Sequence, residues 1–206
     1  MFFAKLSSLN WRRWLTAVFI LGGLALIIVY GMRTYRSFRQ MSYVQAQGLD
    51  DGTASPDAIR GWMTINYIAV AYAVPEEYIY SQLDIPFERR NRRESIRDLN
   101  REYRLGRDED DRTLQIEIAI QEAIIVYREN PVTVHLEDIR AWMTIRYIAA
   151  STGVPESYLF AAIEIPQEDD NEFKELRRLD REYDIRGRDT LEKAIEDALA
   201  NYEEAS

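Results

Sequence analysis

IRGWMTINYIA, residues 59–69, returns as IRAWMTIRYIA at residues 139–149, with nine of the 11 positions identical. The match extends well beyond this stretch. Later matched segments are Val74-Pro75-Glu76 with Val154-Pro155-Glu156, Ile85-Pro86 with Ile165-Pro166, Leu99 with Leu179, and Tyr103 with Tyr183. A match that spans a whole unit indicates an internal duplication. The sequence therefore predicts two copies of one module, at 56–130 and 131–206.

Each copy reads as a series of helices, and no alternating strand pattern is present. Thr64 and Thr144 are suited to N-caps, because a threonine oxygen accepts from the free amides of a first turn. Pro75 and Pro155 suit the start of a second helix, which must end before the next proline. A third helix is expected near 96–103 and 176–183, and a last one from about Thr113 and Thr190. The expected inward residues of these last helices are Ile116, Ile120, Ala123, Ile124 and Tyr127, and Leu191, Ile195, Ala198, Leu199 and Tyr202. The predicted fold class is all-α.

The first two helices of each copy resemble a helix-turn-helix. Copy 2 has a small residue, Ala149, followed four positions later by Gly153, the usual pattern for two touching helices and their turn. Copy 1 has Ala73 in place of that glycine. The second helix of each copy contains carboxylates and no Lys or Arg. DNA phosphates would be repelled there, so the sequence predicts a helical scaffold that binds no nucleic acid.

Near the N-terminus, residues 14–32 form an apolar run without a charge. At 1.5 Å per residue, about 18 such residues reach roughly 27 Å, close to the thickness of a hydrocarbon core. We therefore expect a transmembrane helix at 14–32 after an N-terminal tail, and a plasma-membrane protein with the bilayer as a partner. The alternative of a cleaved signal peptide is weaker, because no small-residue cleavage motif follows the run.

The charges that flank this run are nearly balanced, with Lys5, Arg12 and Arg13 before it and Arg33, Arg36 and Arg39 after it. We expect the N-terminus inside and the large domain outside. Residues 33–55 begin with arginines and continue rich in Gln, Gly, Ser and Asp, which predicts a basic juxtamembrane segment and a flexible linker.

The composition excludes several classes of site. The chain has no cysteine and one histidine, so thiolate sites, cysteine nucleophiles and multi-histidine metal sites cannot form. No phosphate-binding glycine loop or nucleophile elbow is present. The acidic run at 108–111 lacks the glycine and final glutamate of a calcium loop. The sequence predicts no enzyme activity, no cofactor and no metal.

The copies differ most in charge. Their net charges are −4 over 56–130 and −9 over 131–206. Copy 1 has Glu88-Arg89-Arg90-Asn91-Arg92-Arg93 where copy 2 has Gln167-Glu168-Asp169-Asp170-Asn171-Glu172. The candidate binding residues Arg89, Arg90, Arg92 and Arg93 suit anionic lipid head groups, an acidic partner, or charge pairing between copies of the protein. The alternative is a solvated helix start.

Two aromatic residues of the second helices, Tyr80 and Phe160, are further candidates for partner binding. Exposed aromatic side chains often anchor protein interfaces. The alternative is that both belong to the cores of their modules.

As a whole, the chain resembles bacterial single-pass membrane proteins of unassigned function with tandem helix-turn-helix-like repeats. Its repeat, with a Trp-Met-Thr start and a Val-Pro turn, is also similar to small helical domains appended to some bacterial membrane proteins. The resemblance implies an accessory or scaffold protein and transfers no site residue. The leading hypothesis is a membrane-anchored, non-enzymatic scaffold that holds another membrane or membrane-associated protein, since two linked copies raise avidity. A membrane-bound transcription regulator is the alternative. The sequence leaves the oligomeric state open.

Overall fold

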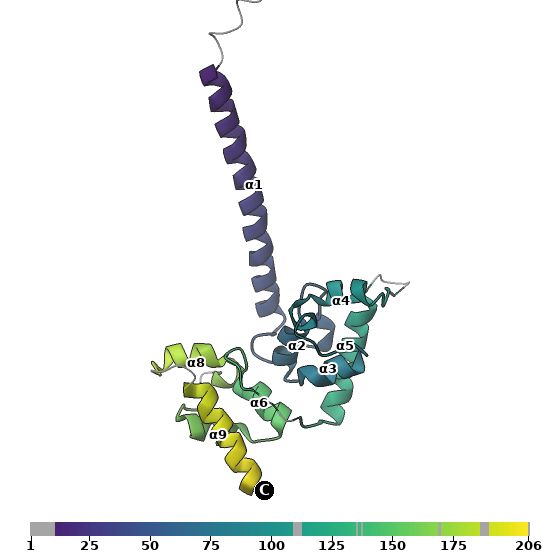
Figure 1. Cartoon of the computed structure of the whole chain (residues 1–206), viewed down its shortest axis with the longest axis vertical. Coiled ribbons are helices and arrows are strands. Elements are labelled where there is room, and N and C mark those ends of the chain that lie inside the picture. The colour runs from purple at the N-terminus through teal and green to yellow at the C-terminus, as the bar shows by residue number, and fades with distance from the viewer. Residues whose placement is uncertain are drawn as a thin grey trace, which may run out of the picture. The chain divides into compact units, whose positions relative to one another are not determined.

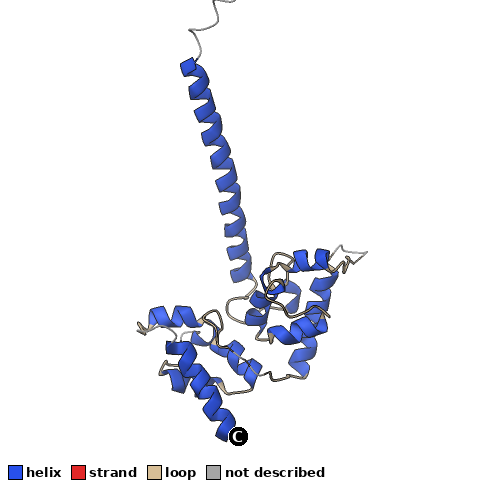
Figure 2. Ribbon diagram, in the orientation of Figure 1, coloured by secondary structure: helices blue, strands red, loops and turns tan. Residues whose placement is uncertain are grey.

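The computed structural model describes residues 11–108, 113–134, 136, 138–168, 170–185 and 190–205. The side chains of 11–17, 33, 36–38, 190 and 203–205 also lie outside the description. The chain divides into two compact units, Met1–Ala46 and Gln47–Ser206. The described residues form helices joined by turns and loops, with isolated bridges and no strand among them, so the all-α prediction is confirmed for them (Figures 1 and 2).

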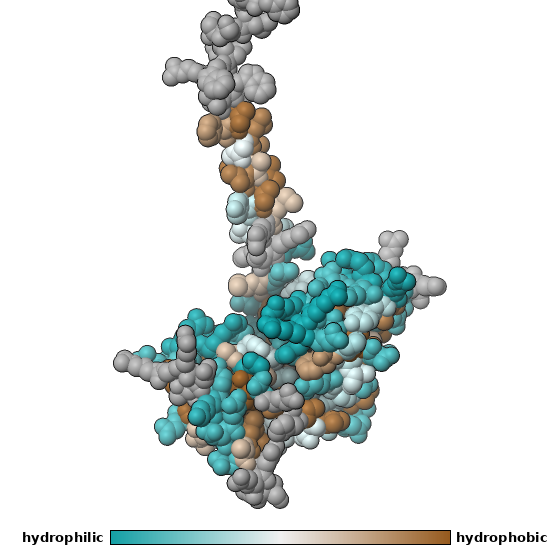
Figure 3. All heavy atoms as spheres, in the orientation of Figure 1, coloured by the Kyte–Doolittle hydropathy of each residue, from teal (hydrophilic) through white to brown (hydrophobic). Residues whose placement is uncertain are grey.

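The described part of the first unit, residues 11–46, forms one helix, α1 (Trp11–Ala46). From Val18 to Met32 its apolar side chains are exposed, as the brown surface of this segment in Figure 3 shows, with Phe19 78% exposed and Ile27 70% exposed. The predicted tail at 1–13 lies mostly outside the described residues. The helix continues through 33–46, where the sequence suggested a juxtamembrane segment and flexible linker.

The expected transmembrane helix at 14–32 is corrected by the structure. Among the described residues, no helix combines the length and the apolar character that a bilayer span requires. The side chains of 14–17 lie outside the description. The single-pass plasma-membrane location inferred from this helix, with its orientation, is corrected with it.

The second unit contains both copies of the repeat, here called module 1 and module 2. Module 1 consists of α2 (Ile65–Tyr72), α3 (Glu76–Gln82), η2 (Asn91–Arg93), α4 (Ile96–Glu102) and α5 (Gln115–Glu129). Module 2 repeats this order with α6 (Ile145–Thr152), α7 (Glu156–Ile163), η3 (Asn171–Phe173), α8 (Leu176–Glu182) and α9 (Thr190–Ala205). A short 3-10 helix, η1 (Pro56–Ala58), lies at the start of module 1, ahead of α2. The duplication read from the sequence is thus a duplication of structure.

The predicted N-caps are confirmed in both modules. The Thr64 hydroxyl accepts from the Tyr67 amide at 3.2 Å, and the Thr144 hydroxyl accepts from the Tyr147 amide at 3.1 Å. Each cap also pairs with the start of the third helix through an isolated bridge. The Ile96 amide donates to the Met63 carbonyl at 2.8 Å, as the Leu176 amide does to Met143 at 2.9 Å. These bonds fix the third helix against the first.

The turn between the first two helices is left-handed in both modules. Gly153 has a φ of 77°, a conformation that glycine adopts freely. Ala73 occupies the same position with a φ of 52°, although a residue with a Cβ disfavours this left-handed conformation. The duplicated backbone therefore imposes the turn whether or not the residue suits it.

Most of the predicted inward residues of the last helices fall into the two cores, whereas Leu199 and Tyr202 on α9 are only partly buried. Ile116, Ile120 and Ile124 are fully buried on α5, and Leu191 and Ile195 are buried on α9. The segment ahead of module 1 is also packed. Leu49 and Ala54 are 4% and 3% exposed, and Gly52 lies against the Phe173 ring of module 2. Residues 47–55, which the sequence assigned to a flexible linker, thus include residues that are packed within the second unit.

Candidate partner-binding cleft

Two tyrosines join the modules inside the second unit. The hydroxyl of Tyr127, near the end of α5, donates to the Ala150 carbonyl on α6 at 2.9 Å. The hydroxyl of Tyr147 on α6 accepts from the Glu76 amide at the start of α3, at 3.4 Å. Tyr147 is 2% exposed, and burial raises the pKa of its hydroxyl. The junction between the modules is therefore a packed interface.

A cleft of about 600 Å³ opens beside this junction. Module 1 contributes the ends of α2 and α5, and module 2 contributes one side of α6 and the start of α7. The cleft is lined by Gly52, Tyr72, Ala73, Tyr127, Arg128, Pro131, Arg146, Ala149, Ala150, Val154, Pro155 and Glu156. Small apolar side chains thus form much of its surface, with charged groups from both modules.

Two arginines of the cleft lie against aromatic rings. The Arg128 guanidinium lies 5.6 Å from the centre of the Tyr72 ring, and that of Arg146 lies 4.9 Å from the centre of the Phe173 ring. Stacking of this kind orients a guanidinium and leaves its N–H edge open to a carboxylate. Among the described residues, no salt bridge is formed by either arginine. The cleft therefore offers two positioned cations.

Glu156 is the acidic group of the cleft. Burial raises the pKa of its carboxyl, the nearby Arg146 lowers it, and Glu172 raises it further, with a net rise. In module 1 the equivalent Glu76 is 2% exposed and forms an ion pair of 2.8 Å with Arg92. The cation that faces this glutamate has thus moved from η2 in module 1 to α6 in module 2, where it lines the cleft.

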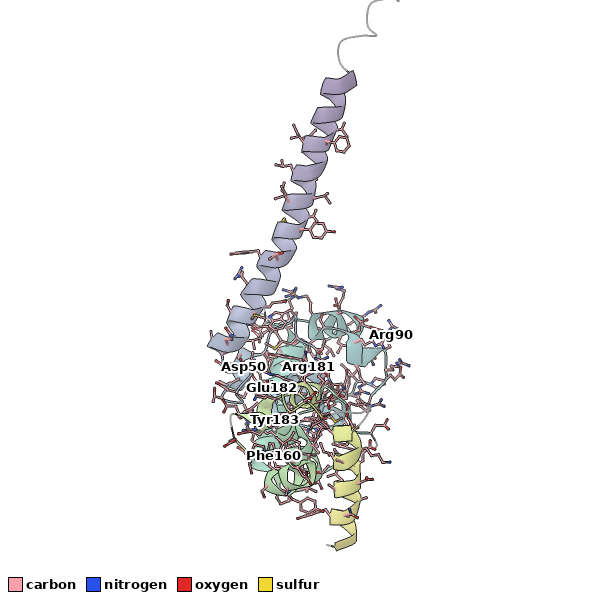
Figure 4. All side chains as sticks on the ribbon, turned by 90° about the vertical axis from the view of Figure 1, so that its left-hand side faces the viewer. Asp50, Arg90, Phe160, Arg181, Glu182 and Tyr183 are labelled. Carbon is pink, nitrogen blue, oxygen red and sulfur yellow. The ribbon has the colours of Figure 1, made fainter. Side chains whose placement is uncertain are left out.

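Tyr80 and Phe160 lie in the cores of their modules, at 1% and 2% exposed. Figure 4 places Phe160 within the body of module 2. Surrounding helices cover both side chains, and the centre of the Tyr80 ring lies 5.4 Å from the centre of the Phe87 ring. The interpretation of both as exposed anchors is therefore corrected, and the core alternative holds.

The four candidate arginines have different environments. Arg92 pairs with Glu76 and lies 5.1 Å from the centre of the Phe87 ring, so its contacts are within module 1. Arg90 is 71% exposed in a pair of 2.9 Å with Glu102 and lies at the edge of the molecule in Figure 4. Arg89 and Arg93 are also exposed. The structure thus separates one structural arginine from three surface arginines.

Sequence reasoning missed the cleft residues. Tyr72, Tyr127 and Arg128 come from module 1, and Arg146 and Glu156 from module 2. One signal for the last two was present in the repeat. The glutamate is retained between the modules, as Glu76 and Glu156, while the residues around it change charge. Asn66 of module 1 corresponds to Arg146 of module 2, and Arg92 corresponds to Glu172.

The described residues contain no group of three His, Asp or Glu side chains placed to hold a metal ion. The acidic run at 109–111 lies outside them, as does His135. Comparison of the chain with models of known families, with curated proteins and with solved structures found no match.

Proposed function

We propose that this protein is a non-enzymatic scaffold that binds a protein partner in the cleft between its two modules. The observation that carries the proposal is that two arginines held against aromatic rings line one cleft. Arg128 comes from module 1 and Arg146 from module 2. Two fixed guanidiniums suit a partner segment that carries carboxylates, because arginine binds these groups through a planar fork.

The remaining lining supports a peptide rather than a small polar ligand. Ala73, Ala149 and Val154 provide small apolar surface next to the arginines, and Tyr72 and Tyr127 add aromatic surface that is held in place by packing. Aromatic and arginine side chains with little freedom are the residues that dominate binding energy at protein interfaces.

Both modules are needed for such a site. Tyr127 and Tyr147 hold α5 and α3 against α6, so the two walls of the cleft are fixed before a partner arrives. A preformed site avoids part of the entropic cost of binding. In this proposal, duplication creates one composite site between the modules in addition to two similar surfaces.

The DNA-binding alternative has no support from this geometry. The second helices of both helix-turn-helix units, α3 and α7, carry no Lys or Arg, and Tyr80 and Phe160 on them are buried. A recognition helix must place polar and basic side chains against bases and phosphates.

Site-specific photo-crosslinking in the native host tests the proposal. A photoreactive residue at Pro131, in the cleft, should capture one discrete partner, whereas the same residue at exposed Arg107 should not. The Arg128→Glu substitution should abolish the adduct at Pro131. Equal labelling from both positions, or an adduct unaffected by Arg128→Glu, would contradict the proposal.

A further inference from the structure

Two loops of the second unit have the same construction and opposite charge. In module 1 the Asn91 side chain donates to the Pro86 carbonyl at 2.9 Å and to the Tyr103 hydroxyl at 2.8 Å. In module 2, Asn171 makes the same two bonds at the same distances, to Pro166 and Tyr183. We call Arg89, Arg90 and Arg93 the basic loop, and Glu168, Asp170 and Glu172 the acidic loop. The two loops therefore have the same hydrogen bonds to Asn91 and Asn171 but side chains of opposite charge.

The described ion pairs of the basic loop are local to module 1. Arg90 pairs with Glu102, and Arg92, next to the loop's exposed members, pairs with Glu76. No ion pair among the described residues joins the basic loop to the acidic loop. Arg89, Arg93, Glu168 and Asp170 are exposed. Within one chain, therefore, the exposed charges of the basic loop and those of the acidic loop do not pair with each other among the described residues.

The last helices of the two modules, α5 and α9, differ in the size and polarity of their exposed side chains. Ile125 and Val126 on α5 are each 48% exposed. Their equivalents on α9 are Ala200 and Asn201, both exposed. The equivalence is fixed by matched ring pairs, since Tyr78 packs on Tyr127 and Tyr158 packs on Tyr202 with 5.1 Å between ring centres in both modules. Module 1 thus has protruding apolar side chains where module 2 has small or polar ones.

Module 2 has a hollow at the corresponding place. A depression of about 530 Å³ lies between α7 and α9, lined by Tyr158, Ala161, Ala162, Ala194, Asp197, Ala198 and Asn201. A second one of about 380 Å³ shares Ala162 and Ala194 and continues to Ile165 and Tyr183. Ile165 immediately precedes Pro166, and Tyr183 holds Asn171, so this groove leads to the acidic loop.

We propose that the chain self-associates by packing module 1 of one copy against module 2 of another. Ile125 and Val126 enter the groove between α7 and α9, and the basic loop meets the acidic loop. The second copy is favoured as the occupant because the protrusion, the groove and both charges belong to this chain, and complementary charge selects a partner and its register. The contact joins two different surfaces, one from each module.

Sedimentation velocity of the full chain, with paired charge reversals, tests this contact. Arg89→Glu with Arg93→Glu makes both loops acidic, and Glu168→Arg with Glu172→Arg makes both basic. Each variant alone should lose more than about tenfold in association constant, because like charges then meet. An equimolar mixture of the two variants should regain the wild-type association, since each acidic loop again finds a basic one.

A control variant and a second test variant separate the proposed contact from a general effect of charge. Arg101→Glu with Arg107→Glu makes the same charge change outside the basic loop and should leave association unchanged. Val126→Asp should weaken it without altering either loop. All variants retain α1, so association through its exposed apolar side chains would be common to every sample. A wild-type chain that stays monomeric, or variants that associate like wild type, would overturn the proposal.

Discussion

Glu76 and Arg92 form an ion pair of 2.8 Å in which the carboxylate is almost fully buried and the guanidinium is about one-third exposed. Burial raises the pKa of Glu76, and Arg92 offsets only part of this rise. The equivalent positions of module 2 hold two glutamates, Glu156 and Glu172, and the compensating cation is Arg146. The same backbone position thus carries a stabilising cation in one module and a repelling anion in the other.

Arg92→Met is therefore expected to destabilise the second unit by about 3 kcal/mol at about pH 7, because a buried carboxylate is left without its partner. The loss should shrink at about pH 4. A carboxyl whose folded pKa is raised stabilises the fold fully below its unfolded pKa and loses that contribution as pH rises through the folded pKa. Urea unfolding of both proteins at the two pH values measures the difference.

Glu172→Met is the matched control for this prediction. It removes a like charge that raises the pKa of Glu156, so stability at about pH 7 should stay equal or increase slightly. A large loss in both variants would show that side-chain packing rather than charge determines the effect.

Ala73→Gly should stabilise the protein by about 1 kcal/mol, because Ala73 has a φ of 52° that glycine adopts without a steric penalty. Gly153→Ala should destabilise by at least as much. Its φ is 77°, and an added Cβ would lie 2.9 Å from the Thr133 side chain. Opposite shifts of the thermal midpoint test the shared left-handed turn, and a destabilising Ala73→Gly would contradict it.

Tyr80→Phe should leave stability unchanged or raise it by up to about 1 kcal/mol. The Tyr80 hydroxyl is buried and has no hydrogen-bond partner among the described residues, so its removal ends a desolvation cost. Tyr103→Phe should cost about 1 kcal/mol, because its hydroxyl accepts from Asn91 at 2.8 Å. Similar losses in both variants, measured by denaturant unfolding, would exclude this account of Tyr80.

The parts of the fold that depend on neighbouring residues were predictable from the sequence. Thr64 and Thr144 cap helices because capping needs only a hydroxyl and the next three amides. The inward face of α5 follows from its period over four turns. A long apolar run alone did not determine the environment of α1.

The site depended on contacts that no local pattern encodes. Tyr80 and Phe160 lie on helices of seven and eight residues, too short for periodicity to separate a covered face from an open one. Arg128 and Arg146 share a cleft only because Tyr127 and Tyr147 fix α5 and α3 to α6. Such pairings between modules arise from packing across the whole unit.

Binding of a partner in the cleft is tested by calorimetry, which gives the dissociation constant of the partner captured at Pro131 for wild type and for Arg128→Glu plus Arg146→Gln. Binding should be weakened by more than about tenfold in this variant, since both carboxylate-binding groups of the cleft are lost. Arg101→Glu with Arg107→Glu, outside the cleft, should bind like wild type. Equal affinity of the cleft variant and the wild type would contradict a partner site between the modules.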